Sequence, residues 1–291
     1  MKRHSRILIP FLVLLLLSGG RDLLAQGGSE PEPSPEPDLQ AKQTSPSLWQ
    51  FGLYGGGALA SNSAEFVTLP GVISCQGDSV LYTGGSGGGF QLAGVAGMQP
   101  SPSTGFLSHI GWSLKAGLSS TGSTFETEER IGQSISPTGE LSPVVSRYTI
   151  EAGLTTLAIE PTLLFQISSD VPLIIGLGPT AGFLIGATYD QKEEIASPSG
   201  ASFADGRTER NIRSGDIEEK AGLTMGGTMT IAYNIQITPV ISLRPEIGGT
   251  LSLSDPIPDV SWGQNLFRGG LSLLINPASR DSSPLGPTLG R

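Results

Sequence analysis

The stretch LIIGLGPTAGFLIGATYD, residues 173–190, is an apolar run broken by glycines, and its first charged side chain is its last residue. A phosphate-binding loop, a membrane helix and a β-strand are the three structures to weigh. The glycine spacing is G-x-G-x-x-x-G, with neither a lysine directly after the last glycine nor a helical pattern beyond it, which argues against a phosphate loop. A helix would carry the glycines and a proline in its middle at a cost in stability.

The stretch instead has the period of two that is typical of a strand with two unlike faces. One parity holds Leu173, Ile175, Leu177, Phe183, Ile185 and Tyr189, and the other holds Gly176, Gly178, Thr180, Gly182, Gly186 and Thr188. We therefore expect a strand that is apolar toward lipid and nearly bare toward an interior. The bare face would leave room for long interior side chains such as Arg244 and Arg268.

The same alternation recurs along the chain. It marks eight segments, near residues 48–61, 89–99, 105–126, 146–168, 172–192, 217–238, 240–254 and 259–276. Long polar connections (62–88, 127–145 and 193–216, with a shorter fourth at 255–259) alternate with tight turns (99–105, 168–172 and 238–239). A soluble sandwich has no reason to sort its loops by length. The sequence thus predicts an all-β fold, an eight-stranded antiparallel up-and-down transmembrane β-barrel over residues 48–276.

The regions outside the predicted barrel differ in composition. A basic start, MKRHSR, and the apolar run 7–17 predict a signal peptide over residues 1–25, with cleavage after Ala25. Residues 26–47 are rich in Pro, Glu and Ser, which predicts a disordered tether. Residues 277–291, PASRDSSPLGPTLGR, are expected to form a flexible tail.

Charge and cysteine content exclude several classes of function. Removal of residues 1–25 would change the formal net charge from -9 to -12, and an acidic chain repels nucleic acid. The single cysteine, Cys75, excludes an internal disulfide. No cluster of His and Cys suggests a metal site, and no motif suggests a cofactor, so we expect neither.

Three blocks of sequence carry a resemblance to a known family. They are FGLYGGG at 51–57, AEFVTLPGVISC at 64–75 and GGSGGGFQLAG at 84–94. With the alternation over residues 48–276, the chain resembles the small outer-membrane β-barrel proteins of the OmpA-like superfamily, and the blocks resemble outer-membrane barrel-domain proteins of Bacteroidetes-like bacteria.

The resemblance implies a location and a set of partners. It implies the outer membrane of a Gram-negative bacterium, with the tether in the periplasm and the long loops outside. Outer-membrane lipid and the barrel-assembly machinery would be partners. Many relatives close their last strand on an aromatic residue that this machinery reads, whereas the last strand here closes on Asn276.

Six charged residues are expected to face the interior: Lys115, Glu151, Glu160, Arg244, Glu246 and Arg268. Glu160 joins the others if its strand changes phase between Leu154 and Leu157, for instance by a bulge, and Glu151 would then lie inside above it. Three cations and three carboxylates in one narrow lumen neutralise each other. We therefore interpret them as a structural ion-pair network that plugs the barrel, not as a catalytic site.

Two patterns suggest catalysis, but each also has a simpler, non-catalytic interpretation. His109 is the only histidine after the predicted signal peptide, but it lies at the short-turn end with no Ser or Asp partner fixed by spacing. GGSGG at 84–88 fits the G-x-S-x-G pattern of hydrolases, whose serine needs a strand before it and a helix after it. We expect a flexible loop there instead, with Cys75 as a lone thiol upstream.

Aromatic residues predict two girdles on the outer surface. Trp49, Phe51, Phe106 and Phe165 would mark the short-turn rim, and Tyr148, Tyr189 and Trp262 the long-loop rim, with Trp112 as a mid-height exception. The predicted function is a structural or surface-interaction role, in which the long loops contact an extracellular ligand. A narrow channel for small solutes is the alternative, and an enzyme acting on outer-membrane lipid is a weaker one.

Overall fold

The computed structural model describes residues 49–75, 77, 80–100, 106–135, 139–168 and 171–277. The predicted signal peptide (1–25), the predicted tether (26–47) and all but the first residue of the predicted tail (277–291) lie outside the described residues.

Ten strands and one short 3-10 helix make up the described chain. They are β1 (Trp49–Phe66), β2 (Tyr82–Met98), η1 (Phe106–His109), β3 (Ile110–Ile135), β4 (Leu141–Gln166), β5 (Leu173–Ser197), β6 (Glu209–Asp216), β7 (Thr224–Tyr233), β8 (Ile235–Gln236), β9 (Ile241–Ser252) and β10 (Ser261–Ile275). All of the strand pairings are antiparallel.

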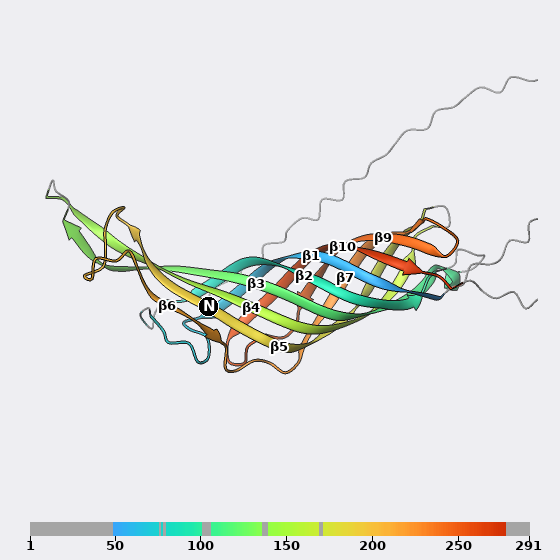
Figure 1. Ribbon diagram of the computed structural model, residues 1–291, viewed down its shortest axis with the longest axis horizontal. Helices are drawn as coiled ribbons and strands as arrows, with labels where there is room; N and C mark the ends of the chain where they lie inside the picture. Colours follow the sequence, from blue (N-terminus) through green and yellow to red (C-terminus); the bar gives the residue numbers. More distant parts are fainter. Residues whose placement is uncertain are drawn as a thin grey trace, which may run out of the picture. The chain divides into compact units, whose positions relative to one another are not determined.

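Eight of these strands close into a ring. The order is β10-β1-β2-β3-β4-β5-β7-β9, and β9 pairs again with β10 (Figure 1). The two remaining strands are additions, since β6 pairs with β5 and the two-residue β8 pairs with β9. The prediction of an eight-stranded antiparallel up-and-down barrel is confirmed.

The outer surface of the ring is apolar over a broad zone, which we call the belt. It consists of exposed residues at alternate positions of every ring strand: Leu53 and Leu59; Phe90 and Leu92; Leu114 and Leu118; Leu157 and Leu163; Leu177 and Phe183; Met225 and Met229; Ile247 and Leu251; Phe267 and Leu271. Exposed apolar side chains on every strand are typical of a lipid-facing surface.

Beyond the belt, three strands continue into what we call the upper sheet, at the left of Figure 1. It comprises residues 126–135 of β3, 141–151 of β4, 188–197 of β5, and β6. The predicted loop 127–145 is therefore wrong in its larger part, because most of it is a hairpin paired from Glu126↔Thr149 to Ile135↔Leu141. The predicted loop 193–216 likewise contains the end of β5 and all of β6.

Strand ends elsewhere also differ from the prediction. β2 begins at Tyr82, so Gly84–Gly88 belong to a strand and not to a flexible loop. The segment predicted as one strand over 217–238 contains β7 and β8, with residues 217–223 lying before them. Glycine and serine positions paired with an equally small neighbour strand give little alternation, which explains the missed start of β2.

The polarity of the two faces reverses along the strands, and β4 shows this most clearly. In the belt, Leu157 and Leu163 face outward while Glu160 faces inward; in the upper sheet, Ile150 is buried inside while Glu151 is exposed outside. Even-numbered residues of β4 face inward throughout. A strand in lipid turns its apolar side chains outward, and a strand in water turns them inward. The polarity can therefore reverse along β4 while the same alternate residues continue to face inward.

This reversal corrects the placement of Glu151. The phase change expected between Leu154 and Leu157 does not occur in β4, because Leu154 is an interior residue. Glu160 is interior without it, and Glu151 lies on the outer surface. A bulge does occur next door in β5, where Ile185 is the extra residue between the pairs Thr156↔Leu184 and Thr155↔Gly186.

The same reversal corrects the long-loop aromatic girdle. Tyr148 and Trp262 are buried inside the barrel, and Tyr189 packs against the same interior cluster after the β5 bulge reverses its side. We call this cluster the apolar plug: Ala64, Phe66, Leu69, Val72, Tyr82, Phe125, Tyr148, Ile150, Ala152, Leu154, Leu184, Ala187, Ile217, Ile257, Val260 and Trp262. It fills the long-loop end of the interior.

The short-turn girdle agrees with the sequence where it is described. Trp49, Phe51 and Phe165 are exposed, and the side chain of Phe106 is outside the described residues. Trp112 is not at mid-height, since it pairs with Met98 at the end of β2 and its ring meets Trp49 edge-on at 5.7 Å between centroids.

A glycine on the inner face makes room for the aromatic side chain of Tyr54. A Cβ on Gly270 would collide with the ring of Tyr54, which is 3% exposed, whereas a Cβ on the adjacent, outward Gly269 would meet nothing within 4 Å. We expect Gly270→Ala to lower the free energy of unfolding by about 1–3 kcal/mol through overpacking, and Gly269→Ala to change it by less than about 0.5 kcal/mol. Urea unfolding in lipid vesicles, followed by tryptophan fluorescence, measures both. Equal losses of stability in the two variants would contradict this packing of Tyr54 against Gly270.

Candidate functional site

The interior of the belt holds a buried ion pair between β4 and β10. Glu160 and Arg268 face inward with side chains 5% and 8% exposed, and Arg268 Nη1 donates to Glu160 Oε1 at 2.5 Å. Gln91 joins both, since its Nε2 donates to Glu160 at 2.9 Å and its Oε1 accepts from Arg268 at 2.7 Å. Arg268 Nη2 also donates to Thr228 Oγ1 at 2.8 Å. With so many polar partners the pair is well satisfied, as a buried ion pair must be.

A second ion pair joins β3 and β9. Lys115 Nζ contacts Glu246 Oε1, and it lies 4.4 Å from the centroid of the Tyr54 ring. Tyr54 thus lies among the charged groups with its ring beneath an ammonium, a favourable cation–π geometry.

Arg244 is the third interior cation and is the least well paired. It is 3% exposed, and its Nη2 donates to Gln50 Oε1 at 2.7 Å. Its Nε has no hydrogen-bond partner in the part of the chain that the structure describes. Of the six predicted interior charges, the structure thus places Lys115, Glu160, Arg244, Glu246 and Arg268 inside, and Glu151 outside.

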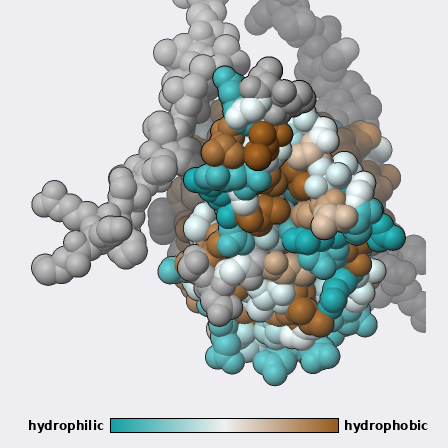
Figure 2. Space-filling view, turned by 90° about the vertical axis from the view of Figure 1, so that its left-hand side faces the viewer, coloured by the Kyte–Doolittle hydropathy of each residue, from teal (hydrophilic) through white to brown (hydrophobic). Residues whose placement is uncertain are grey.

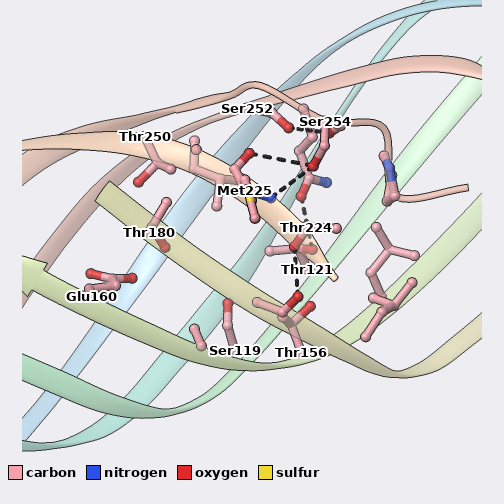
Figure 3. A pocket seen from close by; sticks show the side chains of 18 of the residues that line it. Ser119, Thr121, Thr156, Glu160, Thr180, Thr224, Met225, Thr250, Ser252 and Ser254 are labelled. Carbon is pink, nitrogen blue, oxygen red and sulfur yellow. Dashed lines mark hydrogen bonds between the residues drawn. The ribbon is translucent and has the colours of Figure 1, made fainter. Parts of the chain in front are cut away.

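A cavity of about 100 Å³ lies between the Glu160–Arg268 pair and the apolar plug (Figure 3). Glu160 and Arg268 lie at one side of it and Leu154 and Leu184 at the other. The remaining lining is mostly hydroxyl groups: Ser119, Thr121, Thr156, Thr180, Thr224, Thr250, Ser252 and Ser254. A polar cavity of this volume has room for a few water molecules.

The glycine-bearing face of residues 173–190 is covered by other side chains than the predicted arginines. Space over Gly176 is taken by Thr230 and Thr162, and space over Gly182 by Thr156 and Thr224. These are short hydroxyl side chains from the neighbouring strands. Of the two arginines named, only Arg268 lines the cavity that Gly182 also lines.

A third charged cluster lies in the upper sheet and was missed from sequence. The Glu193 side chain is fully buried, and its carboxylate accepts from Arg210 Nε and Nη2 at 2.8 Å each. Ser146 Oγ donates at 2.8 Å and Asn211 Nδ2 at 2.6 Å. Burial alone would raise the pKa of Glu193, but these donors outweigh burial and hold the pKa below its ordinary value. The cluster fastens β6 to β5 and β4.

The outer face of the upper sheet carries charge in place of the belt. From β3, β4 and β5, five carboxylates and three cations project outward: Glu126, Glu128, Glu151, Asp190 and Glu194, with Arg130, Arg147 and Lys192. Arg147 bridges Glu128 at 2.9 Å and Glu194 at 3.3 Å. Figure 2 shows this end of the molecule, where hydrophilic residues lie beside smaller hydrophobic patches.

His109 and Ser86, the two residues that suggested catalysis, lie far from each other. His109 ends η1 at the short-turn end, with its Nδ1 3.2 Å from the backbone oxygen of Gln166. Ser86 is in β2 near the long-loop end, paired with Ser61 and Thr124, and β2 continues beyond it to Met98 where an elbow would need a helix.

Cys75 lies in the connection after β1. Its thiol contacts Gln191 and packs against the apolar plug, and burial raises its pKa. Among the residues described, no group of three or more His, Cys, Asp or Glu side chains is placed to hold a metal ion. None of the helices found in those residues has the length and apolar character needed to cross a membrane.

Comparisons with known proteins give only distant likenesses. No protein-family model matches the chain, and no curated protein matches it. Among solved structures, the attachment invasion locus protein Ail of Yersinia pestis is 10% identical, with a TM-score of 0.26 over 78% of this chain and 98% of Ail. Neisserial surface protein A is 10% identical, with a TM-score of 0.30 over 77% of this chain and 96% of that protein. Such scores are too low to carry a statement about function.

The Glu160–Arg268 pair predicts a strong effect of removing one partner. Arg268→Met leaves a buried carboxylate without its cation, which we expect to lower the free energy of unfolding by about 3–5 kcal/mol. Adding Glu160→Gln to that variant should recover most of the loss. Arg147→Met, at an exposed pair, is the control and should cost less than about 1 kcal/mol. Urea unfolding of the four proteins tests this, and a double variant as unstable as Arg268→Met would contradict it.

The Glu193 cluster predicts a pH dependence of the upper sheet. Because its folded pKa is lowered, its stabilisation is complete above the ordinary glutamate pKa and is lost as pH falls through the folded pKa. Hydrogen exchange of the β6 amides should therefore accelerate between about pH 5 and pH 3, after correction for intrinsic rates. In Glu193→Gln the exchange should be faster at neutral pH and change less on acidification. An identical pH profile in both proteins would contradict the assignment.

Proposed function

We propose that this chain is an integral outer-membrane β-barrel whose filled interior acts as a rigid support, and that its upper sheet binds an extracellular partner. The observation that carries this is the reversal of polarity along β3, β4 and β5. The belt has the apolar exterior of strands in lipid. At the base of the upper sheet the exterior is charged, while Tyr148 and Ile150 are buried in the apolar plug, as in a domain that stands in water.

The upper sheet has the features of a presented binding surface. Above Phe125, β3 pairs only with β4 among the described residues, and β6 pairs only with β5, so both edges carry backbone groups open to a partner strand. Ile135 and Leu141, beside the tip of the β3–β4 hairpin, are exposed at 71% and 65% although they lie far from the belt. Exposed apolar side chains in such a place favour a protein-binding role.

The charge of the upper sheet favours a cationic partner. Its outer face has an excess of carboxylates, which attracts a cationic protein surface and repels nucleic acid. We propose that outer-membrane lipid covers the belt and that the barrel-assembly machinery inserts the chain. The finer placement within the OmpA-like superfamily is likewise a proposal, supported by the three sequence blocks.

We propose no enzymatic role and no cofactor. His109 and Ser86, the two residues that suggested catalysis, lie at opposite ends of the barrel. A channel for small solutes is also disfavoured, because the apolar plug closes one end of the lumen and the two ion pairs fill its middle.

Two measurements test this proposal. An epitope inserted after Gly200, in the connection between β5 and β6, should bind antibody on intact cells, whereas the same epitope after Thr238, in a short turn, should bind only after the outer membrane is permeabilised. Both proteins should fractionate with outer membranes and migrate faster on gels when unheated. The reverse pattern of accessibility would contradict the orientation.

In planar lipid bilayers the purified protein should give no stable conductance. Regular ohmic steps would contradict the filled interior and would favour the narrow channel instead.

A further inference from the structure

The charged groups inside the belt do not balance. Lys115, Arg244 and Arg268 are three cations, and Glu160 and Glu246 are two carboxylates, which leaves one positive charge among the described interior residues. Both carboxylates have a direct partner, Arg268 and Lys115, so the excess falls on Arg244. An unbalanced charge in a narrow lumen surrounded by lipid is costly unless something compensates it.

Unused hydrogen-bond donors surround Arg244. Its Nε, the Nε2 of Gln50 and the Oγ of Ser242 are buried, and each lacks a hydrogen-bond partner among the described residues. Gln50 and Ser242 are both 0% exposed, and Ser242 has no other polar side-chain atom that could be paired. Three unpaired donors in one place, one of them on the arginine itself, are more than a protein interior ordinarily leaves unused.

The strand register brings these three groups together. Arg244 pairs with Ser272, which pairs with Tyr54, and this defines one row across the interior. The next row toward the short-turn end contains Ser242, which pairs with Leu274, and Leu274 pairs with Gly52.

Gln50, two residues before Gly52, lies one row further still. Because Arg244 bonds Gln50 at 2.7 Å, its side chain crosses the row of Ser242. The three donors therefore lie on adjacent rows of the inner face.

The row of Gln50 contains a further unpaired donor. Gln50 pairs with Gly97, and Gly97 pairs with Ser113, whose hydroxyl is also buried without a partner among the described residues. Gly97 has no side chain to separate the two. Asn276, next to this row, has an unpaired Oδ1, but an amide can turn to present its NH2 group instead.

We propose that these groups form a binding site for one small monovalent anion, such as chloride, held by Arg244, Gln50 and Ser242. One negative charge balances the interior, and N–H and O–H donors are the groups that bind such an anion. A divalent anion would exceed the excess charge by one, and a metal cation would add to it. The site lies at the short-turn half of the lumen, on the opposite side of the ion pairs from the apolar plug.

Thermodynamic linkage gives a direct test, because an anion that binds only the folded barrel stabilises it. The probe is sodium chloride exchanged for sodium gluconate at constant ionic strength, and the measurement is urea unfolding of the full barrel in uncharged lipid vesicles. Above the dissociation constant, each tenfold rise in chloride should raise the folding equilibrium constant about tenfold. Equal unfolding curves in chloride and gluconate would overturn the proposal.

Three variants separate a site from a general salt effect. Arg244→Gln and Gln50→Glu each remove the excess positive charge, and both should unfold independently of chloride. Ser242→Ala removes a hydroxyl that has no described partner, so this variant should fold and should need several-fold more chloride for the same stabilisation. Arg147→Gln, at the exposed pair in the upper sheet, should respond as the unchanged protein does.

A chloride effect that persists undiminished in Ser242→Ala, and in whichever charge variant folds, would overturn the proposal. The test is independent of the proposed surface role, since epitope accessibility on cells does not report on chloride.

Discussion

Closure of the ring is the constraint on which the rest of this structure depends. β10 pairs with β1 from Phe51↔Ile275 to Glu65↔Ser261 and with β9 from Ile275↔Ile241 to Leu266↔Thr250, so no ring strand has a free edge in the belt. In lipid an unpaired backbone N–H or C=O has no water to bond, and only a closed sheet avoids that cost. A ring of eight strands is also narrow, and side chains must fill it. The two faces of each strand are therefore fixed by different surroundings.

The interior is filled in two ways because those surroundings change along the strands. In the belt the exterior is apolar, and the interior takes the polar residues, such as Glu160, Arg268 and Gln91. In the upper half the exterior is charged, and the interior takes Phe125, Tyr148 and Trp262, with ring centroids of Phe125 and Trp262 5.1 Å apart. The hydroxyl-lined cavity marks the boundary between these two regions. The same chain thus has the side-chain pattern of a membrane protein in one half and of a water-soluble protein in the other.

The sequence was sufficient for the ring but not for this reversal. Alternation and turn spacing predict the eight strands, because in the belt each strand contrasts an apolar face with a small or polar one. Apolar side chains face outward only in the belt, and a rule that extends this to whole strands misplaces Glu151, Tyr148 and Trp262. The β3–β4 hairpin was missed for a related reason: in Thr127–Ile135 both faces are largely polar, and such a strand resembles a loop. The sequence does not reveal the roles of Gln91 and Glu193. Gln91 is far in sequence from its partner Arg268, and Arg210, the partner of Glu193, lies on the unexpected strand β6.

The reversal also changes how the long-loop end can act. Loops expected over 127–145 and 193–216 would have been adaptable, whereas the strands found there are held by ladder hydrogen bonds, by the apolar plug and by the Glu193 carboxylate. A surface that is already ordered loses little conformational entropy when it binds. In the proposed binding role, specificity would then come from a fixed arrangement of edges and charges on the sheet. The filled lumen below contributes to this, because side chains packed across the ring resist its deformation and so keep the emerging strands in register.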